Sequence, residues 1–477
     1  MRRQRTLFHG RRPERTPRKD GENPLVPDRR FSALSPDEVE IRFSNRTATQ
    51  FGGYPLLASY LRDVDLSAHL ARAIKMNRGP NAFTAPELAK FLVVAKMLGL
   101  ERLMHLERFR LDPMLVQEMG IDGLPSGKTM GVFLKSFGPG HLAAADRVQS
   151  RILNQEWMAL YGAEGDKAIV LDFDSTVTTA YGKQEGADRG RSFRKKDKPG
   201  FQPKFAFIGG AGLMVHQRLE PQSHNLDKDF FSFQAEAEER LPRNCRVWAI
   251  RADGALYSLE MVRRIEKRGL TYSISAALTS HLRRAIHEIE ESAWEEGVDE
   301  AGHRYSITRI RYCPKTWSEK GEGERTYVIS RRPKTNAAQR RMPHGDIYRY
   351  FAYVTNYRAP LLTQFRFGTE RCSLENFIKE GKGSFQYNFL PCAERGANEA
   401  YLTFVQLAYN LAILFKLRMA PAGVNRWTMA TLRSRVLCIC GNLRRSGGRW
   451  LLSLPVWWPY QTVFRQMQRK VCLALGP

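Results

Sequence analysis

Carboxylates follow two apolar segments of the kind that form central strands. Residues Ala168–Asp174 read AIVLDFD, and the run Arg246–Arg251, RVWAIR, leads into Asp253. Functional residues gather at the carboxyl ends of the strands in open α/β sheets, so these acids are expected to lie near one another. Asp172 and Asp174 would project to the same side of their strand, so both are candidates for this position.

A third acid is offered by a predicted helix over residues 370–382. Spacings of four, four and three residues place one carboxylate and three cations on a single helical face. These residues are Arg371, Glu375, Lys379 and Lys382. Glu370 and Glu380 lie five positions from Glu375 and are rotated from it by roughly 140°. The face bearing Glu375 suits a metal ligand beside phosphates, whereas for an isolated helix a solvated charged face is the alternative.

Three carboxylates from separate elements suit metal-dependent phosphodiester chemistry. Two Mg²⁺ ions roughly 4 Å apart can generate a nucleophilic oxygen and stabilise the leaving oxygen. Mg²⁺ prefers a few carboxylate oxygens together with water and substrate phosphate. Nearby Lys and Arg side chains would bind phosphates and position the strand.

The charge balance of the chain indicates a polyanionic partner. The 477 residues include 75 Lys and Arg against 49 Asp and Glu, for a net charge of +26. Such an excess creates a positive field, and nucleic acid is the commonest partner for that pattern. A ribosome-associated or merely basic soluble protein is the alternative.

Cysteine usage and hydropathy favour a reduced, cytosolic protein. The seven cysteines form no CxxC pair and have no zinc-ligand spacing, and no secretory signal is present. The apolar segment 401–417 is short for a membrane span and contains Gln406 and Asn410. It is predicted to be a buried helix, and no membrane association is expected.

Composition and periodicity divide the chain into regions. The helical periodicity of residues 36–160 suits a DNA-binding domain, and an ordinary helical domain is equally compatible with it. The predicted regions are a disordered basic arm (1–35), a helical DNA-binding domain (36–160), a catalytic core (161–295 and 360–420), a β-rich stretch (296–359) and a basic helical C-terminal region (421–477).

The local motifs together resemble those of a known family. They appear in the order Asp174-Ser-Thr176, Arg251-Ala-Asp253 and Arg371-x3-Glu375-x6-Lys382, with Tyr181–Gly186 and Ala408–Leu411 between and after them. The sequence resembles the DDE transposases of bacterial insertion sequences whose third motif reads Y-x2-R-x3-E-x6-K. Within that superfamily it is most similar to the insertion sequence 1380 family.

The resemblance implies a fold and a set of site residues. It implies an α/β fold with a ribonuclease H-like catalytic core and a β-rich insertion between the second aspartate and the glutamate, and the helical pattern before residue 160 predicts a preceding all-helical N-terminal domain. It further implies that Asp174, Asp253 and Glu375 hold two Mg²⁺ or Mn²⁺ ions. Arg371 and Lys382 would contact DNA, as would Lys379 on the same face. Asp174 is favoured over Asp172 because Ser175 and Thr176 follow it. The tyrosine of the motif falls on Gly368.

The expected function is DNA transposition. The protein would bind the terminal inverted repeats of its element and cleave and transfer DNA strands, as a homodimer in the bacterial cytosol, associated with the nucleoid. A metal-dependent nuclease of the same fold and a catalytically silent DNA-binding repressor are the alternatives. Aromatic residues of the β-rich stretch, Trp317, Tyr350 and Phe351, are candidates to stack on an unpaired base, with packing of the sheet as the competing role.

Overall fold

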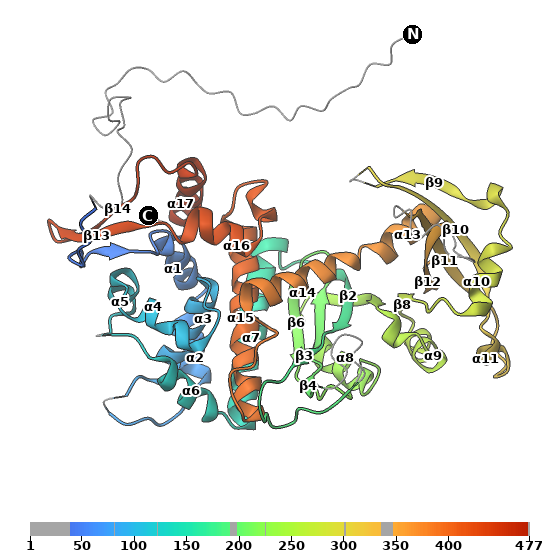
Figure 1. Ribbon diagram of the computed structural model, residues 1–477, viewed down its shortest axis with the longest axis horizontal. Helices are drawn as coiled ribbons and strands as arrows, with labels where there is room; N and C mark the ends of the chain where they lie inside the picture. Colours follow the sequence, from blue (N-terminus) through green and yellow to red (C-terminus); the bar gives the residue numbers. More distant parts are fainter. Residues whose placement is uncertain are drawn as a thin grey trace, which may run out of the picture. The chain divides into compact units, whose positions relative to one another are not determined.

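The computed structural model describes residues 39–80, 82–121, 123–190, 198–224, 226–299, 302–334 and 347–475. The chain divides into two units, Met1–Arg46 and Thr47–Pro477. The basic arm predicted at 1–35 lies outside the described residues. All elements discussed below belong to the second unit (Figure 1).

Seven α-helices of the described chain lie between residues 54 and 161. Thr84 and Glu87 form a capping box at the start of α3, and Ser126 caps α6 by accepting from the Thr129 N–H. The helices are α1 (Tyr54–Asp63), α2 (Leu66–Ala73), α3 (Ala85–Met97), α4 (Glu107–Arg110), α5 (Pro113–Met119), α6 (Gly127–Lys135) and α7 (Pro139–Tyr161).

Nine of the described strands form one mixed sheet in the order β6-β5-β2-β7-β8-β12-β11-β10-β9. Strand β2 is parallel to β7, β7 is parallel to β8, and the other neighbours are antiparallel. The strands are β2 (Lys167–Ser175), β5 (Lys204–Ile208), β6 (Leu213–Arg218), β7 (Cys245–Ala252), β8 (Thr271–Ser275), β9 (Glu295–Val298), β10 (Arg304–Tyr312), β11 (Arg325–Pro333) and β12 (Tyr348–Thr355). The α/β class expected from the sequence is therefore confirmed.

The two faces of β2 carry different side chains. Leu171 and Phe173 are fully buried, and the Phe173 ring contacts Phe230 of α8 (Phe230–Glu239) at a centroid distance of 4.9 Å. Because side chains alternate along a strand, Asp172 and Asp174 project to the opposite face. The apolar residues of this strand thus anchor it on α8, while its acids face the other layer.

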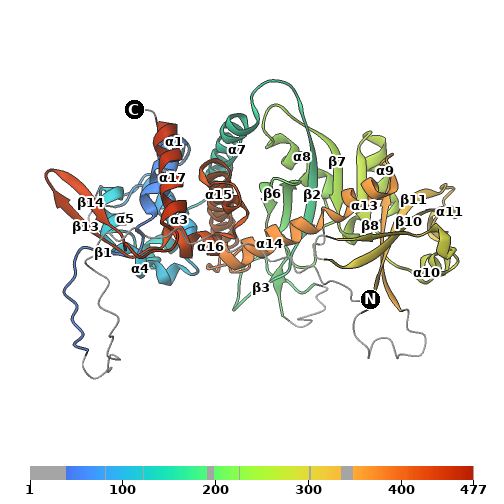
Figure 2. The same ribbon diagram turned by 90° about the horizontal axis from the view of Figure 1, so that it is seen from above.

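That other layer contains two consecutive helices, α13 (Leu361–Thr369) and α14 (Cys372–Phe385), which run across the sheet toward α15 (Arg395–Met419) (Figures 1 and 2). The sequence predicted one helix beginning at residue 370. In the structure Glu370 and Arg371 form a turn between two helices, and α14 begins at Cys372.

Helix α15 holds the edge strand β6 through the motif Ala408–Leu411. The Asn410 side chain accepts from the Met214 N–H at 2.9 Å and donates to the Met214 carbonyl at 2.7 Å. Tyr409 donates to the Gly212 carbonyl at 2.9 Å. An amide side chain thus pairs with backbone groups that an edge strand leaves open.

In the described part of the chain, α15 is the one helix long and apolar enough to cross a membrane, and 89% of its apolar window is buried inside the structure. Its polar residues are used internally, since Gln406 also donates to the carbonyls of Met214 and Val215. The predicted burial of 401–417 is confirmed.

The segment Tyr181–Gly186 is fastened to the start of α15. Gln184 donates to the carbonyls of Leu390 and Cys392, at 2.9 Å each. The Glu185 carboxylate accepts from the backbone N–H of Arg395, the first residue of the helix, at 3.0 Å. A carboxylate there satisfies an open donor and complements the helix dipole.

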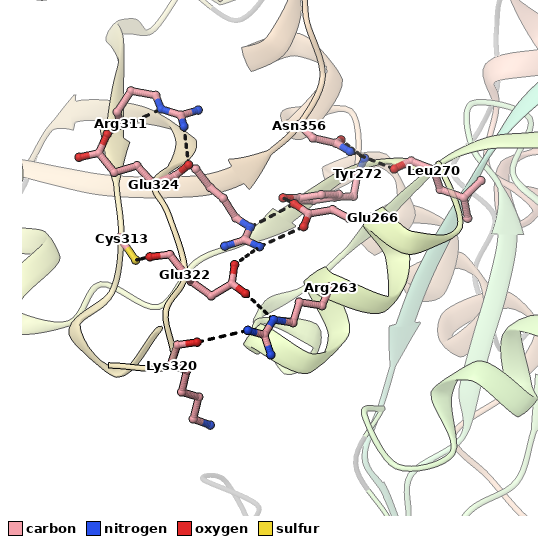
Figure 3. A network of polar contacts seen from close by, with 11 residues as sticks. Arg263, Glu266, Leu270, Tyr272, Arg311, Cys313, Lys320, Glu322, Glu324 and Asn356 are labelled. Atoms are coloured by element: carbon pink, nitrogen blue, oxygen red, sulfur yellow. Dashed lines mark hydrogen bonds and ion pairs between the residues drawn. The ribbon is translucent and has the colours of Figure 1, made fainter. Parts of the chain in front are cut away.

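The β-rich stretch extends the main sheet, and an ionic network ties it to α9 (Leu259–Lys267) (Figure 3). Arg325 at the start of β11 donates to both oxygens of Glu266, at 3.1 and 3.0 Å, and to Glu322 at 2.7 Å. The Tyr272 hydroxyl also donates to Glu266, at 2.8 Å. The antiparallel strands are therefore held against the parallel part of the sheet.

The C-terminal region differs from the helical expectation for 421–477. Between α16 (Met429–Leu432) and α17 (Gln461–Leu475), strands β13 (Gly441–Ser446) and β14 (Arg449–Ser453) form a hairpin. Gly447 and Gly448 make its turn with φ values of +56° and +75°. Two adjacent left-handed residues are what a tight hairpin requires, and consecutive glycines adopt them without steric cost.

Replacing Asn410 by Leu tests the anchoring of β6. This change leaves the Met214 N–H buried without its side-chain acceptor, while the Met214 carbonyl still accepts from Gln406, so we expect a loss of about 2 kcal/mol in the free energy of unfolding. Urea denaturation measures it. Gln466→Leu, on an exposed position of α17, should change stability by less than about 0.5 kcal/mol. Equal effects of the two variants would show that the amide does not anchor the strand.

Candidate active site

Asp174 and Asp253 lie at neighbouring strand ends. Phe173 of β2 and Ala252 of β7 are register partners in the parallel pair, so the next residue on each strand is an aspartate. The Asp174 side chain is 13% exposed. Asp253 accepts from the Ala255 N–H at 3.0 Å and so caps the turn that follows. The predicted meeting of these acids at one edge of the sheet is observed.

Burial raises the pKa of both aspartates, and charge repulsion adds to the rise for Asp174. Burial raises the pKa of Asp174 to about 7, the negative charge of Asp253 adds to the rise, and Arg371 opposes it. Burial likewise raises the pKa of Asp253, against the Ala255 N–H and Arg371. Two carboxylates with raised pKa values at one strand edge form a site that favours added positive charge.

Arg371, in the turn before α14, and Glu375, in the first turn of α14, complete the cluster. The Arg371 guanidinium lies 3.6 Å from an Asp174 oxygen and 3.8 Å from a Glu375 oxygen. Lys379 lies 4.0 Å from the other Glu375 oxygen. The helical face predicted from the spacing is therefore formed, although Arg371 occupies the turn and not the helix.

Lys382 reaches the same edge of β2 from further along α14. Its ammonium group donates to the hydroxyl of Thr176, two residues beyond Asp174. The motif Asp174-Ser-Thr176 and the distant lysine thus meet in space.

The other two glutamates of this region point elsewhere. Glu370 accepts from the buried Arg251 guanidinium at 2.8 Å, although its own side chain is 67% exposed. Glu380 is directed into the core, where it accepts from the Met429 N–H at 2.5 Å and lies 3.6 Å from the Lys416 ammonium. Glu375 is half exposed beside Asp174, as its position on the helix predicts.

Asp172 is committed to a buried ion pair. Its two oxygens accept from Arg251 Nε at 2.6 Å and Nη2 at 2.8 Å, and both side chains are almost fully buried. Arg251 also donates to the Phe367 carbonyl of α13 at 3.1 Å. A Cβ on Gly209 would lie 2.7 Å from this guanidinium, so the turn after β5 needs glycine there. The pair joins β2, β7 and α13 into one unit.

The absence of the motif's tyrosine at position 368 has a steric reason. A Cβ on Gly368 would lie 3.0 Å from the Ser273 hydroxyl and 3.3 Å from the ring of Tyr353. Helix α13 therefore packs directly on β8, and it also contacts β10 and β11. Tyr353, whose register partner is Ser275, lies at the same edge of the sheet as Asp253.

Two buried cations fix the far end of α14. Lys96 donates to the carbonyls of Leu100 and Phe385, at 2.9 and 3.2 Å, and Arg433 donates to the Ser384 carbonyl at 2.8 Å. Burial lowers the pKa of Lys96 to about 7. Cations at the carboxyl end of a helix complement its dipole and bind its open carbonyls.

The donor set fits a divalent cation in its chemistry. Asp174 and Asp253 are hard oxygen ligands of the kind Mg²⁺ and Mn²⁺ take. Over the described ranges, however, no group of three His, Cys, Asp or Glu residues is set close enough to hold a metal ion. The carboxylates instead surround the Arg371 guanidinium, whose Nε is buried without a hydrogen-bond partner in the described structure.

Other candidate residues have different surroundings. Trp317 is 6% exposed and packs on Tyr257, with the Arg325 guanidinium 5.3 Å from its ring. Tyr350 lies beside Trp294, and Phe351 is 36% exposed. For Trp317 these contacts favour the packing role.

Sequence reasoning did not single out Arg251 as an anchor, nor Tyr353. The role of Arg251 could have been predicted from the Arg251-Ala-Asp253 motif, because an arginine within an apolar strand needs a buried partner.

Asp174→Asn should stabilise the protein without metal. A carboxyl whose native pKa exceeds its unfolded value binds its proton more tightly when folded, so stability falls as pH rises from about 4 to about 7. Asparagine removes that loss. In EDTA at pH 8 we expect a gain on the order of 2–4 kcal/mol in the free energy of unfolding, which disappears below about pH 4. A variant less stable than the parent at pH 8 would contradict the raised pKa.

Comparison with known proteins identifies a matching family. The family described as transposase DDE domain group 1 matches residues 31–474. A comparison with curated proteins finds no significant match. Among solved structures, the chain is similar to a cryo-EM structure of the piggyBac transposase synaptic complex with hairpin DNA, with 10% sequence identity and a TM-score of 0.40 over 88% of this chain and 80% of that one. Because the family match spans nearly the whole chain, the protein belongs to the transposase DDE domain group 1 family.

Proposed function

We propose that the protein binds the terminal inverted repeats of its own element and catalyses metal-dependent cleavage and transfer of DNA strands. The observation that carries the proposal is the convergence of Asp174, Asp253 and Glu375 around Arg371 at one edge of the sheet. The net charge of +26 supports a DNA partner.

The strand order supports a ribonuclease H-like core. Strands β6, β5 and β2 form an antiparallel meander, and β2, β7 and β8 are parallel to one another. Strands β9 to β12 then form the β-rich insertion between Asp253 and Glu375. With these features we extend the proposal to an insertion-sequence transposase of the 1380 type, acting in the bacterial cytosol at the nucleoid.

Asp174, Asp253 and Glu375 would hold two Mg²⁺ or Mn²⁺ ions. When bound, such ions lower the pKa of water and stabilise the leaving oxygen of a phosphodiester. Asp174 and Asp253 carry the closely spaced charge that attracts them, and half-exposed Glu375 lies where it can complete the set. The buried pair of Asp172 with Arg251 positions β2 against β7 and α13.

Arg371, Lys379 and Lys382 would bind the DNA backbone beside the carboxylates. The two ion pairs of Arg371 are longer than hydrogen bonds, and its Nε has no partner in the described part of the chain. Its planar donors therefore remain available for a phosphate, which they match in geometry. Lys379 is well exposed on the same face.

The helical region 36–160 is proposed to take part in recognising the element's end. Helices α3, α6 and α7 pack on α15, so this region shares a core with the rest of the chain. Its DNA binding is therefore best measured in the full protein. A homodimer would bring two ends together.

A metal-dependent nuclease and a silent repressor remain distinguishable by experiment. Joining of a pre-cut inverted-repeat end to a plasmid, observed on a gel, supports transposition. Cutting without joining indicates the nuclease, and binding without cutting indicates the repressor.

Glutamates on α14 provide the sharpest test of the assignment. Glu375→Gln should bind end DNA with unchanged affinity but cleave it roughly a thousandfold more slowly with Mg²⁺, because a metal-bound carboxylate contributes several kcal/mol to the reaction. Asp174→Asn and Asp253→Asn should behave in the same way.

Glu380→Gln is the control on the same helix. It weakens the contact with Lys416 and lowers stability, but each folded molecule should cleave at nearly the parental rate. Single-turnover cleavage, normalised to the folded fraction by circular dichroism, measures both variants. The assignment is wrong if Glu380→Gln abolishes cleavage and Glu375→Gln does not.

A further inference from the structure

The β13–β14 hairpin presents three arginines at its tip. Arg444 and Arg445 end one strand, Arg449 begins the other, and all three are exposed around the Gly447–Gly448 turn. Across the residues that the structure describes, none of these guanidinium groups has an ion-pair partner. Trp450, the register partner of Arg445, is 52% exposed beside them.

The whole C-terminal part of the sequence lacks acids. From residue 400 to the end the chain contains 11 Lys and Arg residues and no Asp or Glu. Helix α17 adds Arg465 and Arg469, both exposed. Lys416 and Arg418 pair with acids from other parts of the chain. The exposed arginines of the hairpin tip have no such partner among the described residues, so they generate a local positive field that an external polyanion can neutralise.

The base of the hairpin is fixed while its tip projects. Strand β1 (Ala48–Thr49) pairs with β13 through Ala48 and Asn442 and through Thr49 and Gly441. Leu443 is 5% exposed, so the middle of the strand is packed against the core. A tight glycine turn on an anchored base holds the arginines in a defined arrangement before any partner binds.

We propose that this hairpin tip, Arg444 to Arg449, is a docking element for duplex DNA at the end of the transposon. The inference rests on the proposed function and adds a contact apart from the carboxylate cluster. A two-stranded ribbon fits the major groove, and arginines bind both phosphates and base edges. A second copy of the chain, covering Trp450 and the largely apolar groove that Trp450 lines together with Leu452 and Phe464, is the competing occupant. Charge favours DNA because the tip is cationic and the chain carries a net +26.

The triple variant Arg444→Ala, Arg445→Ala, Arg449→Ala in the full-length protein tests this surface. The probe is a fluorescent duplex carrying the terminal inverted repeat, followed by anisotropy over a series of salt concentrations. When the logarithm of the binding constant is plotted against the logarithm of the salt concentration, loss of two or three phosphate contacts should reduce the magnitude of the slope by about 2. Binding near physiological salt should weaken at least tenfold. Cleavage of saturating pre-bound DNA should be unchanged, because the tip is not part of the carboxylate cluster.

Two further variants make the result decisive. Arg243→Ala, Arg284→Ala, Arg304→Ala removes the same charge at exposed positions elsewhere and should alter the slope by less than half as much. The Arg→Lys triple variant of the hairpin should restore the slope. Failure of lysine to restore it would indicate a folding defect and overturn the inference.

Other outcomes separate the hairpin from the active site. Unchanged binding and slope in the alanine variant would refute the docking role. Unchanged DNA binding with loss of the dimer in light scattering would assign the hairpin to a contact between copies. Full cleavage by Asp174→Asn would instead refute the proposed function, whatever the hairpin does.

Discussion

The repulsion that Asp253 exerts on Asp174, both of them partly buried, is the constraint on which this structure depends. Parallel pairing of β2 and β7 places Asp174 beside Asp253, and burial raises the pKa of Asp174 to about 7. Such a pair is stable only where the surrounding structure holds it in place and supplies positive charge. Arg371 supplies charge in the absence of metal, and the ion pair of Asp172 with Arg251 holds the two strands together directly beneath the site.

Helix α14 must be placed accurately, because Glu375 reaches the aspartates from outside the sheet. Phe377 of this helix lies against the turn at Gly212, where a Cβ would come within 2.8 Å of its ring. Tyr409 of α15 holds the Gly212 turn through its hydrogen bond to the Gly212 carbonyl. Glu380 fixes the side of α14 that faces the core, and the buried Lys96 fixes its carboxyl-terminal end. The N-terminal helices thus contribute, through Lys96, to the position of a proposed metal ligand.

Local sequence patterns predicted those site residues whose position depends only on the periodicity of their own strand or helix. The apolar run ending in Asp174 and the spacing of Arg371, Glu375 and Lys382 follow from strand and helix periodicity alone. The break before α14 could not be predicted in this way, because it depends on Arg251 binding Glu370 and the Phe367 carbonyl. The C-terminal hairpin was also missed, since the helical expectation gave no weight to the adjacent glycines at its turn.

The central claim is that Asp174, Asp253 and Glu375 are ligands of one divalent metal site. Crystals of the protein with end DNA and Mn²⁺ test it most directly, through anomalous scattering recorded at the manganese absorption edge. The account predicts a peak within about 2.2 Å of oxygens of both Asp174 and Asp253, with Glu375 turned toward it and Arg371 moved from between the carboxylates onto a DNA phosphate. Manganese bound at other acids, or an empty site at saturating Mn²⁺ with Arg371 still between Asp174 and Glu375, would contradict it.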